Sequence, residues 1–540
     1  MQSGHDLDRF DSRRATVYAP EGIVSTSQPL AATAGVRMFQ NGGNAFDAAV
    51  AGAAALNVVE PTSTGIGGDA FALYRTADGE VGGIRSCGYA PTEATIEAVR
   101  ERIAADDDDP TGVSMPERGP HTVTVPGAAR GWETTVESLG TLSFETVLQP
   151  AIRYATDGYP VSETIASYWT GAEELFTDHN AREAYLIDGR APDPGETIRL
   201  PALGRTLRRI ADEGADAVYE GEIADAIVDA VRSRGGFLTR NDLASFTPTR
   251  IDPISTTYHG AEVYQLPPSN QGLIALEALN IADAVDAGDC RYESPDRIHL
   301  FAEATKRAFE DGHRYIADPA YERVPPLTDR AYIDARAEGI DRSAATDVEF
   351  GVPDSHAEDA DTVLVCAADT DGNVVSFINS RFMGFGSGIV AGDTGIALQN
   401  RGASFSLDPT HPNSFAPGKR PFHTLMPGVI EFDDDDVAAF GVVGGYMQPQ
   451  GHVQVISNLV DYGMDLQPAL DAPRWRYRED GTLAVEERTP MGIGSKLVRR
   501  GHDVRIEIPA AFGGAQIARV TDGTLSGASE PRTDGTSIGY

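Results

Sequence analysis

The segment at 359–380, DADTVLVCAADTDGNVVSFINS, constrains the fold of this sequence more than any other stretch. An acidic stretch leads straight into the apolar run TVLVCAA, the turn-forming residues DTDGN follow, and a second run, VVSFINS, comes next. Two such runs around an Asp/Gly/Asn turn predict a β-hairpin with strands at 362–368 and 374–378. The first strand is predicted to begin abruptly at Thr362, directly behind Asp361. Most strand threonines have no chemical role, so this residue alone is weak evidence of function.

Helical periodicity dominates the chain before this hairpin, and short strands dominate after it. Apolar residues recur at helical spacing in six segments, at 31–40, 45–58, 144–157, 202–213, 223–234 and 295–311. Asn44 follows a Gly-Gly pair and is placed to cap the second of these helices. The sequence also predicts a helix at 449–461 and strands at 82–85, 262–265, 395–399, 425–432 and 437–443. Helices and strands mixed in this way predict an α+β or layered α/β architecture with stacked sheets.

The charge of the chain excludes several classes of partner. Its 540 residues include 81 acidic and 44 basic ones, for a net charge of −37, and lysine occurs only at Lys306, Lys419 and Lys496. Such a field repels nucleic acid and anionic membranes. Acidic residues spread over the whole chain predict a halophilic surface whose charge is screened in molar salt. A cationic partner would instead predict one dense acidic block, and the runs at 106–109 and 433–436 are too short for that.

The cysteines and the N-terminal segment predict a cytoplasmic protein. Cys87, Cys290 and Cys366 are odd in number and far apart, and they form no CxxC or Cys/His spacing, so neither a disulfide framework nor a metal site is predicted. The first residues carry an arginine pair but no apolar segment of the kind that a signal peptide has. No window of 18 apolar residues occurs, so we expect no membrane span.

Two features downstream of the hairpin are suited to chemistry. The stretch FINSRFMGFGSGIVAGDTGIALQNRGASF is rich in glycine, which allows a backbone to approach another group closely. Further on, an apolar strand ends in Gly444-Gly445 and a helix begins a few residues later. Consecutive amides near a helix N-terminus can form an oxyanion site. The alternative is a strand-to-helix turn that needs a positive φ at one glycine.

The chain resembles the gamma-glutamyltransferase family of N-terminal-nucleophile hydrolases over nearly its whole length. Several long motifs carry the resemblance in the family's order. They are FQNGGNAFDAAVA (39–51), STGIGGDAF (63–71), VPGAARGWE (125–133), LTRNDLASF (238–246), DTVLVCAADTDGNVVSF (361–377), GFGSGIVAGDTGIALQN (384–400), RPFHTLMPGVI (420–430), VVGGYMQPQGHVQV (442–455) and SGASEPRTDG (526–535).

The resemblance implies a four-layer αββα fold and a self-cleaving precursor. The family's precursor is cut just before a threonine that begins a core strand, and the matching position is Thr362. A cut between Asp361 and Thr362 would give a large chain, 1–361, and a small chain, 362–540, that form one interlocked globule. The new α-amine could act as the base for the Thr362 hydroxyl. Ser380 matches a hydroxyl that bonds the nucleophile, and Gly444 with Gly445 match the oxyanion hole; the scheme needs no metal or cofactor.

The substrate pocket departs from the family's pattern where a γ-glutamyl group would bind. The arginine that holds the substrate α-carboxylate in the family is matched by Cys87, and Arg85 lies two residues earlier, where a strand would point it to the same face. Two carboxylate-binding serines are matched by His423 and Thr424. These departures predict a changed mode of carboxylate recognition.

The positions around the substrate amine depart as well. The family's acidic residue is matched by Ser404, and an asparagine and a glutamine nearby are matched by Phe382 and Arg401. A site that holds an ammonium should offer a carboxylate. Arg401, His423 and Arg85 would instead suit an acyl group with a terminal carboxylate and no amine, as in the acylase-like branch of the family. Each of these side chains also has an ordinary structural use, in core packing or ion pairing.

The sequence supports three functional hypotheses, and the first two, which we favour, make the protein an amidohydrolase. The first is a gamma-glutamyltransferase or glutathione hydrolase that transfers the acyl group to water or an amine. The second is an acylase for a dicarboxylic-acyl or other non-glutamyl amide. A short segment at 406–421, where many members carry a lid loop, favours hydrolysis over transfer. The third is an uncut, non-catalytic relative that binds small amides. The predicted partners are a small-molecule amide and the two chains of one precursor.

Overall fold

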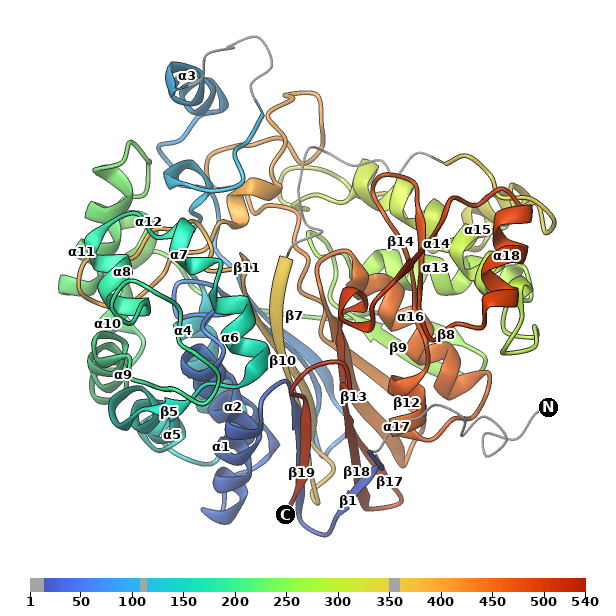
Figure 1. The fold of residues 1–540 in the computed structure, drawn as a ribbon, viewed down its shortest axis with the longest axis horizontal. Helices are drawn as coiled ribbons and strands as arrows, with labels where there is room; N and C mark the ends of the chain where they lie inside the picture. Colours follow the sequence, from blue (N-terminus) through green and yellow to red (C-terminus); the bar gives the residue numbers. More distant parts are fainter. Residues whose placement is uncertain (1–13, 107–113, 349–359) are drawn as a thin grey trace.

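Two seven-stranded sheets are stacked face to face between two layers of helices in the computed structural model, which describes residues 14–106, 114–348 and 360–540 (Figure 1). The four layers confirm the predicted α+β class and the αββα arrangement. Most of the acidic runs at 106–109 and 354–361 lie outside the described residues.

The first sheet contains the predicted hairpin at its centre. All its neighbouring strands are antiparallel. Their order is β19 (Thr536–Gly539), β2 (Gly22–Thr26), β10 (Ala360–Asp369), β11 (Val374–Met383), β3 (Asp69–Arg75), β4 (Val81–Ser86) and β7 (Thr249–Ile251).

The second sheet is also antiparallel and lies on the other side of the central core. Its order is β1 (Val17–Ala19), β18 (Thr524–Ser529), β17 (Gly514–Thr521), β13 (Asp436–Val443), β12 (Gly428–Asp433), β9 (Ala261–Gln265) and β8 (Ile254–Tyr258). A small sheet of β14 (Trp475–Tyr477), β15 (Leu483–Glu486) and β16 (Val504–Glu507) lies on this side of the molecule, and a two-stranded sheet of β5 (Tyr159–Pro160) and β6 (Thr197–Ile198) lies among the helices of the first half.

Helices from the first half of the chain cover the first sheet, at the left of Figure 1, with α2 packed directly on β10 and β11. They are α1 (Pro29–Gln40), α2 (Ala45–Val59), α4 (Ala128–Leu139), α5 (Phe144–Asp157), α6 (Glu163–Trp169), α7 (Ala172–Leu175), α8 (His179–Tyr185), α9 (Pro201–Glu213), α10 (Asp216–Tyr219), α11 (Gly221–Arg232) and α12 (Arg240–Ala244). The helix α3 (Ile96–Asp106) stands apart from this layer, at the top of Figure 1.

Later helices cover the second sheet, at the right of Figure 1, with α13 on β8 and α16 on β13. They are α13 (Gly272–Ala284), α14 (Pro295–Tyr315), α15 (Arg330–Glu338), α16 (Met447–Val460), α17 (Leu466–Asp471) and α18 (Met491–Arg499). The described residues also form the short 3-10 helices η3 (Pro120–Thr122), η5 (Arg401–Ser404) and η6 (Pro509–Phe512). No helix in the described part of the chain combines the length and apolarity needed to cross a membrane.

The side chains of β10 alternate between two hydrophobic cores. Val363 and Val365 belong to the core under the helices of the first half, whereas Leu364 and Cys366 belong to the core between the sheets. Because strand side chains alternate, Thr362 is directed to the space between the sheets. The second sheet reaches the same space through the end of β13, which is followed by Gly444.

Local signals explain several boundaries. Asn44 caps α2 as predicted: its side chain accepts from the Phe46 and Asp47 amides, and Asp47 reciprocates in a capping box.

Two predictions were wrong. In the uncut chain β10 begins at Ala360, two residues before Thr362, because Ala360 and Asp361 also pair with β11. The segment 395–399 forms only isolated bridges, since positive φ at Gly395 turns the backbone away from a strand.

Candidate active site

The peptide bond between Asp361 and Thr362 lies at an irregularity in the central hairpin. Asp361 pairs with Phe382 and Val363 pairs with Asn379, so the register shifts around Thr362. Phe382 has a φ of 83°, which is unusual for a residue other than glycine and is a source of backbone strain.

Ser380 connects the two strands at this irregularity. Its Oγ accepts a hydrogen bond from the Phe382 amide at 2.7 Å and donates one to the Asp361 carbonyl oxygen at 2.7 Å. The serine is fully buried. Its hydroxyl is therefore fixed on the carbonyl of the predicted cleavage site, rather than on the Thr362 hydroxyl.

Thr362 lines a pocket with a volume of about 480 Å³. The residue is only 5% exposed. Its Oγ1 forms no hydrogen bond with any described residue. An unpaired hydroxyl beside a pocket is costly for stability alone, and it is the arrangement that a nucleophile needs. Asp361 lines the same pocket, so both sides of the predicted cleavage site face it.

Gly444 brings the second sheet to this pocket. Gly444 and Gly445 have φ values of 114° and 55°, which confirms that this strand-to-helix turn needs residues without a side chain. Among the described residues none accepts a backbone hydrogen bond from either glycine amide. Two free amides that precede α16 can stabilise a negative oxygen near Thr362.

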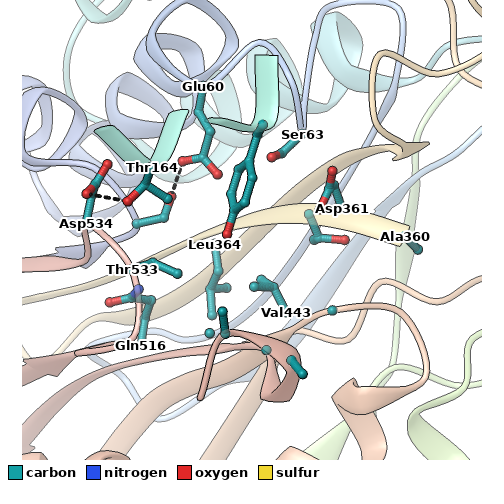
Figure 2. A pocket seen from close by; sticks show the side chains of 18 of the residues that line it. Glu60, Ser63, Thr164, Ala360, Asp361, Leu364, Val443, Gln516, Thr533 and Asp534 are labelled. Atoms are coloured by element: carbon teal, nitrogen blue, oxygen red, sulfur yellow. Dashed lines mark hydrogen bonds between the residues drawn. The ribbon is translucent and has the colours of Figure 1, made fainter. Parts of the chain in front are cut away.

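The remaining walls come from distant parts of the chain and include two carboxylates (Figure 2). Glu60 follows α2, and its Oε2 accepts from Ser27 Oγ at 2.6 Å. Asp534 precedes β19, and its Oδ1 accepts from Thr164 Oγ1 at 2.9 Å. Burial raises the pKa of Glu60 to about 8. A cation bound beside this carboxyl group would favour its ionised form and lower that pKa.

Arg401, Phe382 and Thr424 form a buried cluster outside this pocket. The Arg401 guanidinium carbon lies 4.2 Å from the centre of the Phe382 ring, and its Nη1 donates to Thr424 Oγ1 at 2.8 Å. Arg401 is 0% exposed, and its Nε and Nη2 have no hydrogen-bond partner among the described residues. Gln271 connects this cluster to the glycine pair, because its Nε2 donates to the carbonyl oxygens of both Thr424 and Gly445.

Asp69 and His423 lie beside this guanidinium. His423 Nδ1 accepts from the Leu425 amide, so Nε2 carries the proton and donates to Asp69 Oδ2 at 3.0 Å. Burial lowers the pKa of His423 well below its usual value, and burial raises the pKa of Asp69 to about 7 although Arg401 opposes that rise. Gln399 Nε2 also donates to Asp69, at 3.0 Å. The one carboxylate of the cluster is therefore engaged by the protein itself.

Three predicted substrate-binding residues lack a hydrogen bond to this cluster. Arg85 donates through Nη2 to the carbonyl oxygens of Pro267 and Pro268, at 2.6 and 2.8 Å, and its charge helps to lower the pKa of His423. Cys87 is buried just after β4, so the strand alternation expected for it and Arg85 does not apply. Ser404 is buried at the end of η5.

The sequence reasoning missed Glu60, Asp69 and Asp534. A signal was present, because Asp69 lies in STGIGGDAF, Asp534 lies in SGASEPRTDG, and Glu60 stands just before the first of these motifs. The three residues converge on the central sheets from segments that are far apart in sequence.

A group of possible metal ligands lies far from this site in sequence. In the described part of the chain, His299, Glu303 and His502 place their ligand atoms within 4.8 Å of one another. Glu303 already accepts from Lys306 Nζ at 2.8 Å and from Arg307 Nη1 at 3.1 Å. Two cationic side chains already neutralise this carboxylate, and His299 Nδ1 is hydrogen-bonded to His502 Nε2 at 2.8 Å, so the donor set does not favour a metal ion.

Comparisons with known proteins agree with this geometry. The profile of the gamma-glutamyltranspeptidase family matches residues 31–540. The chain is 36% identical to the glutathione hydrolase-like YwrD proenzyme of Bacillus subtilis over 97% of this chain and 99% of that protein. It is 35% identical to the oxamate amidohydrolase proenzyme of Klebsiella pneumoniae, over 96% and 98%. The crystal structure of cephalosporin acylase from Bacillus halodurans superposes with a TM-score of 0.90 at 43% identity, over 98% of both chains.

Proposed function

The chain belongs to the gamma-glutamyltranspeptidase family of self-cleaving hydrolases, and on that premise we propose that Thr362 is its nucleophile. Cleavage between Asp361 and Thr362 yields chains 1–361 and 362–540. The observation that carries the proposal is the shared pocket, in which the unpaired Thr362 hydroxyl lies with Asp361 and the free Gly444 amide. The two chains stay together because β10 and β11, from the small chain, lie between β2 and β3 of the large chain.

Self-cleavage uses the Thr362 hydroxyl against the carbonyl carbon of Asp361. The oxygen–carbon bond forms, the amide C–N bond breaks, and the proton of the hydroxyl passes to the departing nitrogen, which becomes the α-amine of Thr362. Ser380 donates to the carbonyl oxygen while that oxygen carries negative charge. Water from the pocket hydrolyses the ester and frees Asp361 as a carboxyl terminus.

The mature enzyme repeats this chemistry on an amide substrate. The α-amine, with a usual pKa near ~8, takes the proton of the Thr362 hydroxyl as that oxygen attacks the substrate carbonyl. The amides of Gly444 and Gly445 stabilise the oxyanion, and each such donor contributes about 3 kcal/mol in comparable sites. The α-amine then protonates the leaving amine, and water or a second amine releases the acyl group from Thr362.

The acyl half of the substrate is proposed to carry a terminal carboxylate and no amine. Arg401 supports this, because its buried guanidinium keeps two nitrogens without partners and can bind a carboxylate through both. Asp69 supports it as well, since it is held by His423 and Gln399 and cannot serve a substrate ammonium without losing these bonds. Oxamate, the substrate named for the Klebsiella relative, is an amide of this kind.

A γ-glutamyl substrate is the second candidate, which the family and the name of the Bacillus subtilis relative favour. Turnover of glutaryl-p-nitroanilide and γ-glutamyl-p-nitroanilide separates the two, because they differ only in the α-amine. We expect a higher kcat/KM for the glutaryl compound, and Arg401→Met should remove most of that advantage whereas Arg401→Lys should keep part of it. A strong preference for the γ-glutamyl compound contradicts the proposed acyl specificity.

Intact mass spectrometry of the purified protein tests the nucleophile. Wild type should give two chains, of which the smaller begins TVLVC, and Thr362→Ala should remain one chain of 57.4 kDa. Thr362→Ser keeps a hydroxyl and should still be cut. A folded wild-type protein that stays uncut in molar salt would refute the role proposed for Thr362.

A further inference from the structure

Two carboxylates in the Thr362 pocket lack a positive partner. Glu60 is 6% exposed and its side chain is hydrogen-bonded by Ser27. Asp534 accepts hydrogen bonds from Ser162, Thr164 and Gln28. Among the described residues no arginine, lysine or histidine lies within ion-pairing distance of either carboxylate. Glu60 is buried and Asp534 is partly buried. Carboxylates withdrawn from water are ordinarily paired with a cation, so this wall lacks a positive charge.

Gln516 adds a third acceptor to the same wall. It projects from β17 and lines the pocket near Asp534, as Figure 2 shows. Gln516 is 2% exposed, and its Oε1 has no hydrogen-bond partner in the described part of the chain. The wall thus offers oxygen acceptors from Glu60, Asp534 and Gln516, and a primary ammonium group, with three N–H donors and no acceptor, complements them.

The position of this wall relates it to one half of the substrate. The proposed acyl-binding cluster around Arg401 and Phe382 lies outside the pocket, whereas the pocket contains Thr362 and Gly444. A substrate whose acyl half reaches Arg401 and whose carbonyl meets Thr362 therefore places its amine half in the pocket.

The basic residues of the pocket come from the other half of the molecule. Arg476 lies on β14, where its Nη1 donates to the Ala511 carbonyl oxygen at 3.4 Å, and Arg478 is paired with Glu507. The two carboxylates lie elsewhere, because Glu60 follows α2 and Asp534 is hydrogen-bonded by Ser162 and Thr164 at the start of α6. A cationic group entering the pocket is consequently drawn to the Glu60 and Asp534 side.

We propose that Glu60 and Asp534, with Gln516, bind a protonated amino group carried by the amine half of the substrate. The preferred substrates are then amides of a diamine, in which one nitrogen forms the amide and the other stays protonated. This inference rests on the proposed function only in assigning the pocket to the amine half.

Two amides of equal shape test the proposal. The n-butylamide and the 1,3-diaminopropane amide of one acyl group differ in a terminal methyl against a terminal ammonium. The acyl group is whichever of glutaryl or γ-glutamyl the enzyme hydrolyses, so the test does not depend on the acyl specificity. At fixed salt, the kcat/KM of wild type for the diamine amide should exceed that for the butylamide by about 10-fold or more, because one charge-assisted hydrogen bond contributes a gain of this size.

Glu60→Gln, Asp534→Asn and the double variant should lose this preference, so that the ratio of the two kcat/KM values falls toward one in each variant, because the charge that distinguishes the diamine amide no longer has a partner. Glu213→Gln, an exposed carboxylate on α9, is the matched control and should keep the preference. Cleavage into two chains reports that each variant is folded. No preference in wild type, or an unchanged preference in the double variant, overturns the proposal.

Binding without turnover separates this inference from the proposed function. Calorimetric titration with N-acetyl-1,3-diaminopropane should show binding to wild type and about 10-fold weaker binding to the double variant. If the protein hydrolyses neither amide, the proposed function fails, and the titration still decides whether the wall binds an ammonium. Equal binding to wild type and the double variant would contradict the proposal that Glu60 and Asp534 bind an ammonium group.

Discussion

The hydroxyl of Ser380 donates a hydrogen bond to the carbonyl oxygen of Asp361, with 2.7 Å between the two oxygens. The same hydroxyl accepts from the Phe382 amide, which fixes its direction. The bond therefore polarises the carbonyl that the proposed self-cleavage attacks, before any substrate is present. In the uncut chain Ser380 acts on the electrophile, while Thr362 is free to move toward it.

Ser380→Ala should slow self-cleavage by about 10- to 100-fold, because a hydrogen bond to a developing charge is worth about 1.5–3 kcal/mol. The measurement is the rate at which freshly refolded precursor separates into two chains on a denaturing gel. Ser376→Ala is the matched control, since Ser376 lies on the same strand and donates to the Phe440 carbonyl oxygen at 2.8 Å. Equal rates for the two variants would contradict the role of Ser380.

Gly444→Ala should lower kcat by about 100-fold once the chain is cut, because an oxyanion donor is displaced. The φ of 114° disfavours a side chain, and an added Cβ would lie 3.2 Å from the Cα of Gly513. The control is Gly463→Ala, which also has positive φ, at 57°, but has nothing within 4 Å of the added atom. Gly463→Ala should keep its kcat; similar losses in both variants would point to backbone strain alone.

The sequence predicted the elements that local chemistry specifies. Asn44 sets the start of α2 through its own side chain, and the DTDGN turn sets the hairpin of β10 and β11. The start of β10 could not be predicted in the same way, because Ala360 joins the strand only through pairing with Met383. The expected strand at 395–399 failed because Gly395 takes a positive φ next to the backbone of Leu203, which is a tertiary contact.

The residues of the site also divide into those that local sequence identifies and those that only the folded structure brings together. The resemblance placed Thr362, Ser380 and Gly444 in one site because those residues lie inside long motifs. Glu60 and Asp534 are ordinary acidic residues in a chain with 81 of them, and only the folded arrangement reveals that they share one wall. Arg85 illustrates the converse, since its candidate role came from strand alternation, but its guanidinium is bound to backbone carbonyls instead.

Glu277→Gln should flatten the dependence of stability on pH. Burial raises the pKa of Glu277 well above its usual value, and the nearby Asp311 adds to the rise. The folded protein keeps the proton, whereas the unfolded chain releases it above about pH 4.5. The stabilising contribution is thus complete below that pH and falls as pH rises toward the folded-state pKa, by ~1.4 kcal/mol per pH unit.

Urea unfolding of wild type and Glu277→Gln at several pH values between about 4 and 8 measures this effect. The variant should match wild type at the acidic end and gain stability relative to it as pH rises. Glu322→Gln, at an exposed position, should follow wild type throughout. A constant difference between Glu277→Gln and wild type at every pH would mean that Glu277 is ionised in the folded protein.

The net charge of −37 predicts that stability depends on salt. Self-repulsion of the acidic surface opposes the compact state, and the Debye length falls from about 10 Å at 0.1 M to about 3 Å at 1 M salt. The Tm should therefore rise between about 0.1 M and 2 M KCl, with most of the rise where screening changes fastest. Because excluded solutes also stabilise folded proteins, sucrose at matched osmolality is the control and should raise the Tm less. Equal effects of KCl and sucrose would show that solute exclusion, rather than charge screening, dominates, and that the acidic surface needs no high salt.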